Sequence, residues 1–284
     1  MVVSFHPIIE ADENIICAGR LPNAADLAAI KRAAAVILPQ GCSEALYRMA
    51  RRNCPHVFPN LDVRFDFPGK RGQIQLFERL GLEYPETRCY DSVVNYRHSS
   101  QPIAFPAVVK FDWGGQGDTV FKVAQQDELS KVIERASDFE STGQNGFLIQ
   151  QFIAARYRSL RVVVIGSRFI SYWRVQSKKD TFGTSVSGGA AIDHASDRHL
   201  QKAAKDRAKH FCRETGLQLA GFDFIFDEAD VHATQASPLI LEVNFYFGRT
   251  GLGGSDAYYQ LLTEEVDKWL AALPVKGCIF ERIR

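Results

Sequence analysis

Short apolar runs alternate with segments of helical periodicity along most of the chain. The apolar runs that predict strands lie at residues 14–18, 35–38, 56–58, 105–111, 119–123, 147–153, 221–226 and 239–244. Helical spacing predicts helices at residues 24–33, 44–52, 70–80, 126–139, 197–215 and 256–270. Residues 160–165 and 168–175 flank Gly166-Ser167, which is typical of a hairpin with a two-residue turn. This alternation indicates an α+β (α/β) protein.

Composition narrows the class of protein and its partners. The chain has 284 residues, of which 46% are hydrophobic, and this suits one large domain or two to three small ones. The formal net charge is +1. This balance favours no nucleic-acid partner and no membrane surface, so small molecules are the expected partners.

The cysteines and the first residues bear on location. The six cysteines include no C-x-x-C pair, which is typical of reduced thiols in a cytoplasmic protein. They are Cys17, Cys42, Cys54, Cys89, Cys212 and Cys278. The first residues do not read as a signal peptide, and no apolar run approaches the roughly 20 residues that span a bilayer. We therefore expect a cytoplasmic protein.

The pattern divides the chain into three parts. A small βαβα unit covers residues 1–66 and is too short to be a full dinucleotide-binding domain. Pro68-Gly69 is a boundary signal, and a second part covers residues 67–155. A third part, with the hairpin and the last two apolar strands, covers residues 156–284.

A glycine-rich turn follows an apolar strand that ends in Lys110. The turn contains Gly114, Gly115, Gln116 and Gly117. Small residues let backbone N–H groups approach a phosphate, and a lysine beside them supplies a positive charge. No G-K-[ST] follows, so this is not a P-loop, and an ordinary hairpin turn is the alternative.

Three oxygen-bearing side chains are predicted on two late strands. Alternation places Asp223 on the face opposite Phe222, and it places Glu242 and Asn244 together on one face of the other strand. If the strands are neighbours, the three side chains converge, and hard oxygen ligands suit Mg²⁺. The alternative is a set of ordinary polar residues on a solvated sheet face.

The order of these features resembles the ATP-grasp superfamily, and most of all RimK-type glutamate ligases and bacterial glutathione synthetases. The resemblance covers about residues 70–270 and includes the strand to Lys110, the glycine-rich turn and the run Gln150-Gln151-Phe152-Ile153. It continues through Ser159-Leu160-Arg161 and Asp223 to Glu242-Val243-Asn244. It implies two α+β subdomains that clasp ATP, preceded by a small N-terminal α/β domain.

The resemblance also implies roles for individual residues. Lys70 and Lys110 would contact the nucleotide phosphates under the Gly114–Gly117 loop. Adenine would lie against Gln150, Gln151, Phe152 and Ile153. One or two Mg²⁺ ions would bind Asp223, Glu242 and Asn244. Arg161 and Arg174, with Lys110, would act on the γ-phosphate and the acyl group, and Arg249 is a weaker candidate for an anionic substrate group.

Several positions depart from the family pattern. Gln151 and Ser159 stand where acids are frequent, and Thr184 stands where an Asn near the metal is frequent. The usual S-P-G after E-V-N is replaced by Phe245-Tyr246-Phe247-Gly248. We therefore expect the substrate-side loop to differ from that of the family.

The reaction implied by this resemblance is ADP-forming ligation of a small carboxylate to an amine, either of which could be an amino acid or a peptide. The carboxylate would attack ATP to give an acyl phosphate, which the amine would then attack to form an amide or peptide bond. A kinase that phosphorylates a hydroxyl and a non-catalytic nucleotide-binding module remain as alternatives. Many relatives self-associate, so a homo-oligomer is also considered.

Overall fold

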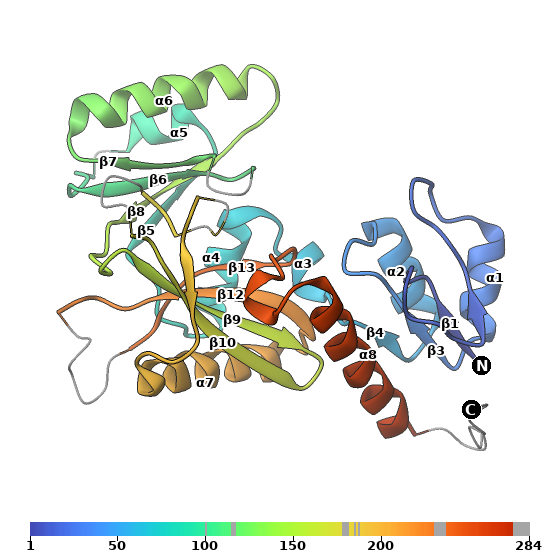
Figure 1. Cartoon of the computed structure of the whole chain (residues 1–284). Helices are drawn as coiled ribbons and strands as arrows, with labels where there is room; N and C mark the ends of the chain where they lie inside the picture. Colours follow the sequence, from blue (N-terminus) through green and yellow to red (C-terminus); the bar gives the residue numbers. More distant parts are fainter. Residues whose placement is uncertain are drawn as a thin grey trace.

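The structure is a computed structural model in which three β-sheets follow one another along the chain (Figure 1). It describes residues 1–99, 101–114, 118–177, 182–184, 186, 188–229 and 237–274. The architecture confirms the α+β prediction. The sheets are formed within residues 2–58, 87–151 and 158–244, whereas the proposed boundaries at 66/67 and 155/156 stay predictions.

The first sheet is parallel, with strand order β2-β1-β3-β4. Its strands are β1 (Val2–Ser4), β2 (Glu13–Asn14), β3 (Ala35–Ile37) and β4 (Val57–Phe58), and its helices are α1 (Ala24–Arg32) and α2 (Glu44–Asn53). The Asn23 side chain accepts hydrogen bonds from the first turn of α1, and the Asp26 carboxylate accepts one from Asn23 N, so the two residues form a capping box. Ser43 caps α2, because its side chain accepts a hydrogen bond from Leu46 N.

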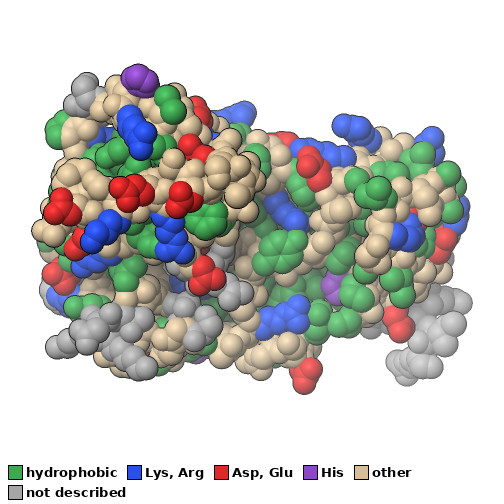
Figure 2. Space-filling model, turned by 90° about the horizontal axis from the view of Figure 1, so that it is seen from above, with side chains coloured by type: hydrophobic (Ala, Val, Ile, Leu, Met, Phe, Trp, Pro, Cys, Tyr) green, Lys and Arg blue, Asp and Glu red, His purple; other side chains and the backbone are tan. Residues whose placement is uncertain are grey.

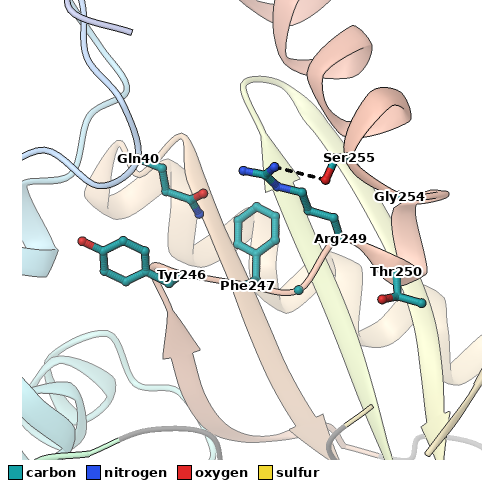
Figure 3. Close-up of a pocket in the computed structure, with 8 residues that line it drawn as sticks. Gln40, Tyr246, Phe247, Arg249, Thr250, Gly254 and Ser255 are labelled. Atoms are coloured by element: carbon teal, nitrogen blue, oxygen red, sulfur yellow. Dashed lines mark hydrogen bonds between the residues drawn. The ribbon is translucent and has the colours of Figure 1, made fainter. Parts of the chain in front are cut away.

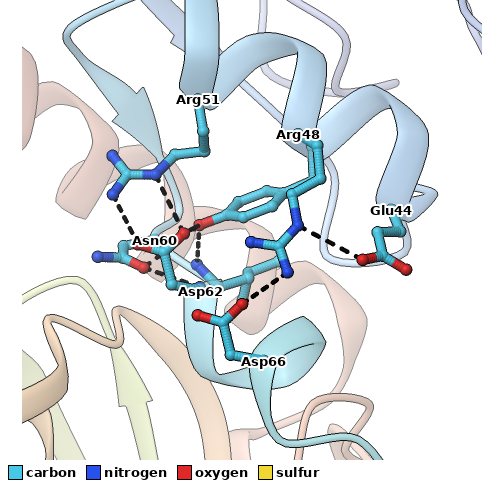
Figure 4. A network of polar contacts seen from close by, with 8 residues as sticks. Glu44, Arg48, Arg51, Asn60, Asp62 and Asp66 are labelled. Carbon is cyan, nitrogen blue, oxygen red and sulfur yellow. Dashed lines mark hydrogen bonds and ion pairs between the residues drawn. The ribbon is translucent and has the colours of Figure 1, made fainter.

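A network of ion pairs fastens this first sheet to the segment that leaves it (Figure 4). Arg48 and Arg51 project from α2 toward the short helix α3 (Asp62–Asp66). Arg48 pairs with Asp66 at 2.6 Å, and Arg51 pairs with Asp62 at 2.6 Å. The chain therefore leaves the first sheet in a fixed direction.

The second sheet is antiparallel, with strand order β5-β8-β6-β7. It consists of β5 (Thr87–Tyr90), β6 (Ala107–Phe111), β7 (Val120–Val123) and β8 (Phe147–Gln151), with helices α5 (Val93–His98) and α6 (Gln126–Glu140). Val109 and Ile149 pack in one hydrophobic cluster with Leu129 of α6. Alternation then turns Lys110 and Gln150 to the opposite face of the sheet.

The third sheet is antiparallel, with strand order β11-β10-β9-β12-β13. It consists of β9 (Arg158–Ile165), β10 (Arg168–Val175), β11 (Ala191–Asp193), β12 (Leu219–Ile225) and β13 (Leu239–Asn244). Helix α7 (Arg198–Thr215) covers one face, where the rings of Phe211 and Phe222 lie 5.0 Å apart. The other face carries the polar residues of the candidate site.

Two further helices connect these parts. Helix α4 (Gly69–Arg79) packs against both β8 and β13, and α8 (Ser255–Ala272) follows the short 3-10 helix η1 (Thr250–Leu252). The ring of Trp269 on α8 lies 5.5 Å from that of Phe58 on β4. The first and third sheets consequently share one hydrophobic core, whereas the residues between the second sheet and α6 form another.

The elements that the sequence misjudged are short. A strand was expected at residues 14–18, but only Glu13–Asn14 pairs there, and Ile16 is 78% exposed. The centre of the first sheet is instead β1, which the apolar pattern did not single out. Three residues give too few alternations to predict a strand.

The outer surface carries charges of both signs. Figure 2 shows acidic and basic side chains intermixed over one face of the molecule. Among the described residues, no helix combines the length and apolar character needed to cross a membrane.

Candidate active site

The third sheet carries a row of polar side chains on the face that α7 leaves open. Register aligns Arg161 of β9 with Asp223 of β12, and Asp223 with Glu242 of β13. Asn244 lies two residues beyond Glu242 on β13. Arg174 of β10 pairs with Ser159, which lies two residues before Arg161 on β9. The predicted convergence of Asp223, Glu242 and Asn244 is therefore present in the structure.

Asp223 is clamped by two arginines. Arg161 contacts both of its carboxylate oxygens, with Nε 2.5 Å from Oδ1 and Nη2 2.8 Å from Oδ2. Arg174 Nη2 lies 2.8 Å from Oδ1. Burial alone would raise the pKa of Asp223, which is 3% exposed, but the two guanidinium groups lower it to about 2. This carboxylate is charged at every physiological pH.

Asn244 links the two carboxylates. Its Nδ2 donates to Asp223 Oδ2 at 3.1 Å and to Glu242 Oε1 at 2.9 Å. The three side chains thus surround one small space with carboxylate and amide groups. A cation held there would require the Asn244 amide to turn so that its oxygen faces inward.

This donor set fits Mg²⁺. Two carboxylates and one amide oxygen are hard ligands, and Mg²⁺ is usually bound by one or two carboxylates plus waters and phosphate oxygens. Among the described residues, no group of three or more His, Cys, Asp or Glu side chains could hold a metal. A softer, fully protein-ligated ion such as structural zinc is therefore a poor match to Asp223, Glu242 and Asn244.

Two lysines share the electrostatic environment of these carboxylates. Lys110 is 8% exposed, and its side chain forms no hydrogen bond or ion pair with any described residue. Burial lowers its pKa and so does Lys70, whereas Glu242 and, more weakly, Asp223 raise it. The pKa of Lys70 is lowered by burial, against the same upward effect of Glu242. Glu242 thus favours the charged form of both lysines, and the nucleotide roles of Lys70 and Lys110 stay predictions.

Helix α4 explains why Lys70 is near Glu242. Gln73 on this helix hydrogen bonds the backbone of the edge strand β13 in both directions, with 2.9 Å to Val243 O and 2.7 Å from Val243 N. Val243 lies between Glu242 and Asn244, so this amide pair fixes the strand at the candidate metal site. Lys70 lies one turn earlier on the same helix.

Lys70 also contacts the start of the glycine-rich loop. Its Nζ donates to Trp113 O at 3.3 Å and to Gly114 O at 3.4 Å. The expected positions Gly115, Gln116 and Gly117 lie outside the described residues. Trp113 packs on Phe139 of α6 at a ring distance of 4.4 Å, which makes it part of the second hydrophobic cluster.

A close approach makes a glycine necessary at the beginning of α4. Gly69 has φ +74°, and an added Cβ would lie 2.6 Å from Asp112 Oδ1. Asp112 in turn accepts hydrogen bonds from Arg71 N at 2.8 Å and from Arg71 Nε at 3.0 Å. The base of the glycine-rich loop is therefore fixed to α4.

The predicted adenine segment follows β8. Gln150 is 2% exposed, and its Nε2 donates to Thr87 Oγ1 at 2.8 Å. Gln151 has an exposed side chain, and its backbone N donates to Glu86 O at 2.8 Å. These bonds fix the end of the strand, and the nucleotide roles of Gln150, Gln151, Phe152 and Ile153 stay predictions.

An aromatic pair follows that segment. The ring of Phe152 lies 3.9 Å from Lys122 Nζ and 6.4 Å from the ring of Phe182. Ile153 is the next residue along the chain and is partly buried. Phe182 was not predicted, because nothing in its local sequence indicates that it would approach Phe152.

The sequence did not predict how Ser159 and Gly221 contact the two arginines. Ser159 Oγ lies 2.9 Å from Arg174 Nη2 and 2.5 Å from Thr184 Oγ1, so these two departures from the family pattern contact each other. Gly221 lies beside Arg161, and an added Cβ would be 3.0 Å from Arg161 Nη1. Only the cross-strand register reveals either arrangement.

A cavity of about 470 Å³ adjoins the third sheet at its junction with the first (Figure 3). Its described lining residues are Gln40, Tyr246, Phe247, Gly248, Arg249, Thr250, Gly254 and Ser255. Aromatic runs such as Phe245-Tyr246-Phe247 usually pack in a core. Tyr246 is instead 60% exposed, because the loop after β13 turns outward beside Gln40.

The fold and this arrangement of lysines, carboxylates and amide define an ATP-grasp protein. A sequence model of the RimK-like ATP-grasp domain matches residues 69–262, which is more than half of the chain. The chain therefore belongs to the RimK-like ATP-grasp domain family.

Solved structures with the same fold include ligases. A RimK domain ATP-grasp protein from Sphaerobacter thermophilus has a TM-score of 0.60 and 17% identity, covering 82% of this chain and 81% of that one. D-alanine–D-alanine ligase from Bacillus anthracis has a TM-score of 0.62 and 14% identity, covering 91% and 84%. The ATP-grasp ligase PsnB, complexed with a minimal precursor, has a TM-score of 0.54 and 18% identity, covering 84% and 79%. At these identities the likeness establishes the fold alone.

A relative by sequence is described as the uncharacterized protein MG012 of Mycoplasma genitalium. It is 25% identical over 128 residues, which are 45% of this chain. The match spans 41% of that relative's length.

Proposed function

We propose that this protein is an ATP-dependent carboxylate–amine ligase that acts through an acyl phosphate with Mg²⁺. The observation that carries the proposal is the convergence of Asp223, Glu242 and Asn244 on two paired strands. Lys70 lies on the helix whose Gln73 holds this part of β13. Phosphoryl transfer needs alignment and neutralisation of charge more than covalent participation by the protein. Ammonium groups opposite a pair of carboxylates suit that requirement.

Each group has a proposed part in the reaction. Lys70 and Lys110 would bind the polyphosphate, and Asp223, Glu242 and Asn244 would hold Mg²⁺, which offsets phosphate charge when bound. Arg161 and Arg174 are proposed to leave Asp223 in part and to contact the γ-phosphate and the acyl group. The substrate carboxylate oxygen attacks the γ-phosphorus and ADP departs. The amine then attacks the acyl carbon and phosphate departs.

Supporting observations come from the fold and from the cysteines. The neighbouring structures of the same fold include proteins described as a D-alanine–D-alanine ligase and an L-amino acid ligase. Small carboxylates and amines, including amino acids, are therefore the proposed substrates. The five cysteines among the described residues are free thiols, which supports a reducing, cytoplasmic setting.

Trapping the acyl phosphate tests this proposal. The full chain is incubated with Mg-ATP, pooled small carboxylates and hydroxylamine, and ADP and hydroxamate are measured together. We expect both products in equal amounts. Glu242→Gln should abolish both while the chain stays folded, as its circular dichroism spectrum shows. Glu134→Gln, at an exposed position on α6, should change neither product. A phosphorylated alcohol without hydroxamate would reject the ligase in favour of a kinase.

A further inference from the structure

The polar row across the third sheet continues beyond the residues that have a proposed part in the reaction. Register aligns Arg161 with Asp223 of β12 on one side and with Tyr172 of β10 on the other. Directly opposite residues of neighbouring strands point to the same face of a sheet. Arg174 lies two residues after Tyr172 on β10 and shares that face. Tyr172 therefore lies beside both arginines.

The hydroxyl of Tyr172 is a polar group without a hydrogen bond. The residue is 2% exposed, yet its Oη forms no hydrogen bond with any described residue. No fully buried side-chain nitrogen or oxygen of the described residues lacks a partner. The Oη of Tyr172 therefore reaches accessible surface, although nearly all of the ring is buried. A ligand oxygen at this point would gain a hydrogen bond that the described chain leaves unmade.

The 3-10 helix η1 packs on the ring of Tyr172 and leaves the hydroxyl uncovered. A Cβ added to Gly251 would lie 2.2 Å from Cζ of Tyr172, and the next nearest atoms are Cε2 at 2.4 Å and Cε1 at 2.5 Å. All three are ring carbons, so Gly251 covers the face of the ring rather than Oη. Because Gly251 has no side chain, η1 can approach this closely and hold the ring in one place.

The hydroxyl of Tyr172 is a hydrogen-bond donor at neutral pH. Burial raises its pKa, and Arg161 and then Arg174 lower it by less. The group therefore keeps its proton, while the two guanidinium groups add positive potential around it. A protonated donor beside two cations suits an oxygen that becomes negatively charged during a reaction.

The place of Tyr172 in the row separates it from the proposed metal site. Strand β10 is two strands away from β12, which carries Asp223, and three away from β13, which carries Glu242. At about 4.8 Å between neighbouring strands, these separations are about 10 Å and about 14 Å. The γ-phosphate would lie at the metal ligands and the acyl group beyond it, at the arginines. Tyr172 is on that far side, where the acyl group would lie.

We propose that Tyr172 is a further catalytic residue, whose hydroxyl donates a hydrogen bond to the acyl oxygen while the amine attacks the acyl phosphate. The inference rests on the proposed ligase function. In this step the amine nitrogen forms a bond to the acyl carbon, and the π electrons of the carbonyl move onto its oxygen. The carbonyl then re-forms as the C–O bond to phosphate breaks. Phosphate leaves with that electron pair and takes the proton of the nitrogen, and Tyr172 keeps its own proton throughout.

Tyr172→Phe in the full chain tests the assignment, because it removes the hydroxyl and keeps the ring. Positional isotope exchange reports acyl-phosphate formation; it uses ATP with heavy oxygen in the β–γ bridge, Mg²⁺ and the pooled small carboxylates, without a nucleophile. Hydroxamate formation at saturating hydroxylamine reports attack on the acyl carbon. We expect exchange within about twofold of the natural chain and hydroxamate turnover lower by about 10²-fold, the effect of removing one oxyanion donor.

Tyr96→Phe is the matched control. The Tyr96 hydroxyl also has no hydrogen bond within the described residues, but this residue lies on α5 and packs against Tyr90 and Phe147. Tyr96→Phe should change neither exchange nor hydroxamate turnover. Both variants should melt like the natural chain, since neither loses a hydrogen bond formed by the described residues.

The two readouts also separate this inference from the proposed function. Unchanged hydroxamate turnover in Tyr172→Phe would overturn the inference alone. An equal loss of exchange and hydroxamate would overturn it as well, because the hydroxyl would then act on phosphoryl transfer and not on the acyl oxygen. A natural chain that shows neither exchange nor hydroxamate would instead reject the ligase function, and the role of Tyr172 with it.

Discussion

Asp223 should contribute to the folding stability of the chain, because two arginines pair with its carboxylate. Replacing it by Asn removes the negative charge and leaves Arg161 and Arg174 buried without a carboxylate partner. The pKa of Asp223 falls from 3.8 to about 2, which corresponds to about 2.5 kcal/mol at roughly 1.4 kcal/mol per pKa unit. Breaking a buried ion pair by removing one partner costs about 3–5 kcal/mol. Because Asn keeps some hydrogen bonds, we expect a loss of about 2–4 kcal/mol.

Urea unfolding monitored by tryptophan fluorescence measures this loss. Trp173 is 1% exposed and lies on β10, one residue before Arg174, so it reports on the same sheet. Glu134→Gln is the control: Glu134 is exposed on α6, and we expect a change within about 0.5 kcal/mol. Adding Arg174→Gln to Asp223→Asn should recover part of the stability, because one fewer cation lacks a partner.

The contribution of Asp223 to folding stability should decrease at acidic pH. Since the pKa of Asp223 is lower in the folded protein than its ordinary value, its contribution is complete above about pH 4 and is lost as the pH falls toward about 2. Asp223→Asn should lack this component of acid destabilisation. An Asp223→Asn protein as stable as the natural chain at neutral pH would refute the idea that the two arginines depend on this carboxylate.

Two other substitutions follow from the site. Lys110→Met should raise the free energy of unfolding by about 1–2 kcal/mol, because a buried, unpaired ammonium group is removed. The same substitution should abolish binding of a non-hydrolysable ATP analogue. Thermal melting measures the first effect and titration calorimetry the second, and unchanged nucleotide binding would contradict the assignment of Lys110 to the phosphates. The natural chain should also gain stability as the pH rises toward 10.5, since burial lowers the pKa of Lys110 in the folded state, and Lys110→Met should lack that component. Gly221→Ala should lower the free energy of unfolding, measured in urea, by about 1–3 kcal/mol, because the new Cβ overpacks Arg161 and Phe247. Gly248→Ala is the control, since no atom lies within 4 Å of its added Cβ. Equal effects of the two substitutions would argue against overpacking.

Much of the architecture follows from local patterns in the sequence. The hairpin around Gly166 and the helix cap at Asn23 were predictable because turn and capping chemistry involve neighbouring residues. The faces of Asp223 and Glu242 were also predictable, since alternation along an apolar strand has only two settings, whereas their pairing was expected only if the two strands are neighbours. These predictions need no information about distant parts of the chain.

The electrostatic partners were less predictable. Arg161 and Arg174 were expected near the γ-phosphate, whereas the structure brings both onto Asp223. That contact depends on the position of β9 between β10 and β12 and on the register of the three strands. Neither the strand order nor the register could be predicted from the sequence. The backbone contacts of Gln73 and the packing of Gly251 on Tyr172 likewise depend on how helices α4 and η1 pack against separate strands.

The two hydrophobic clusters described above have a consequence for ligand-dependent cooperativity. The second sheet and α6 form one cluster, and the first and third sheets share another, which also includes Leu148 of β8. The two clusters can therefore differ in local stability. Lys110 lies on the second sheet and Asp223 on the third, so a nucleotide that contacts both should couple the unfolding of the two sheets.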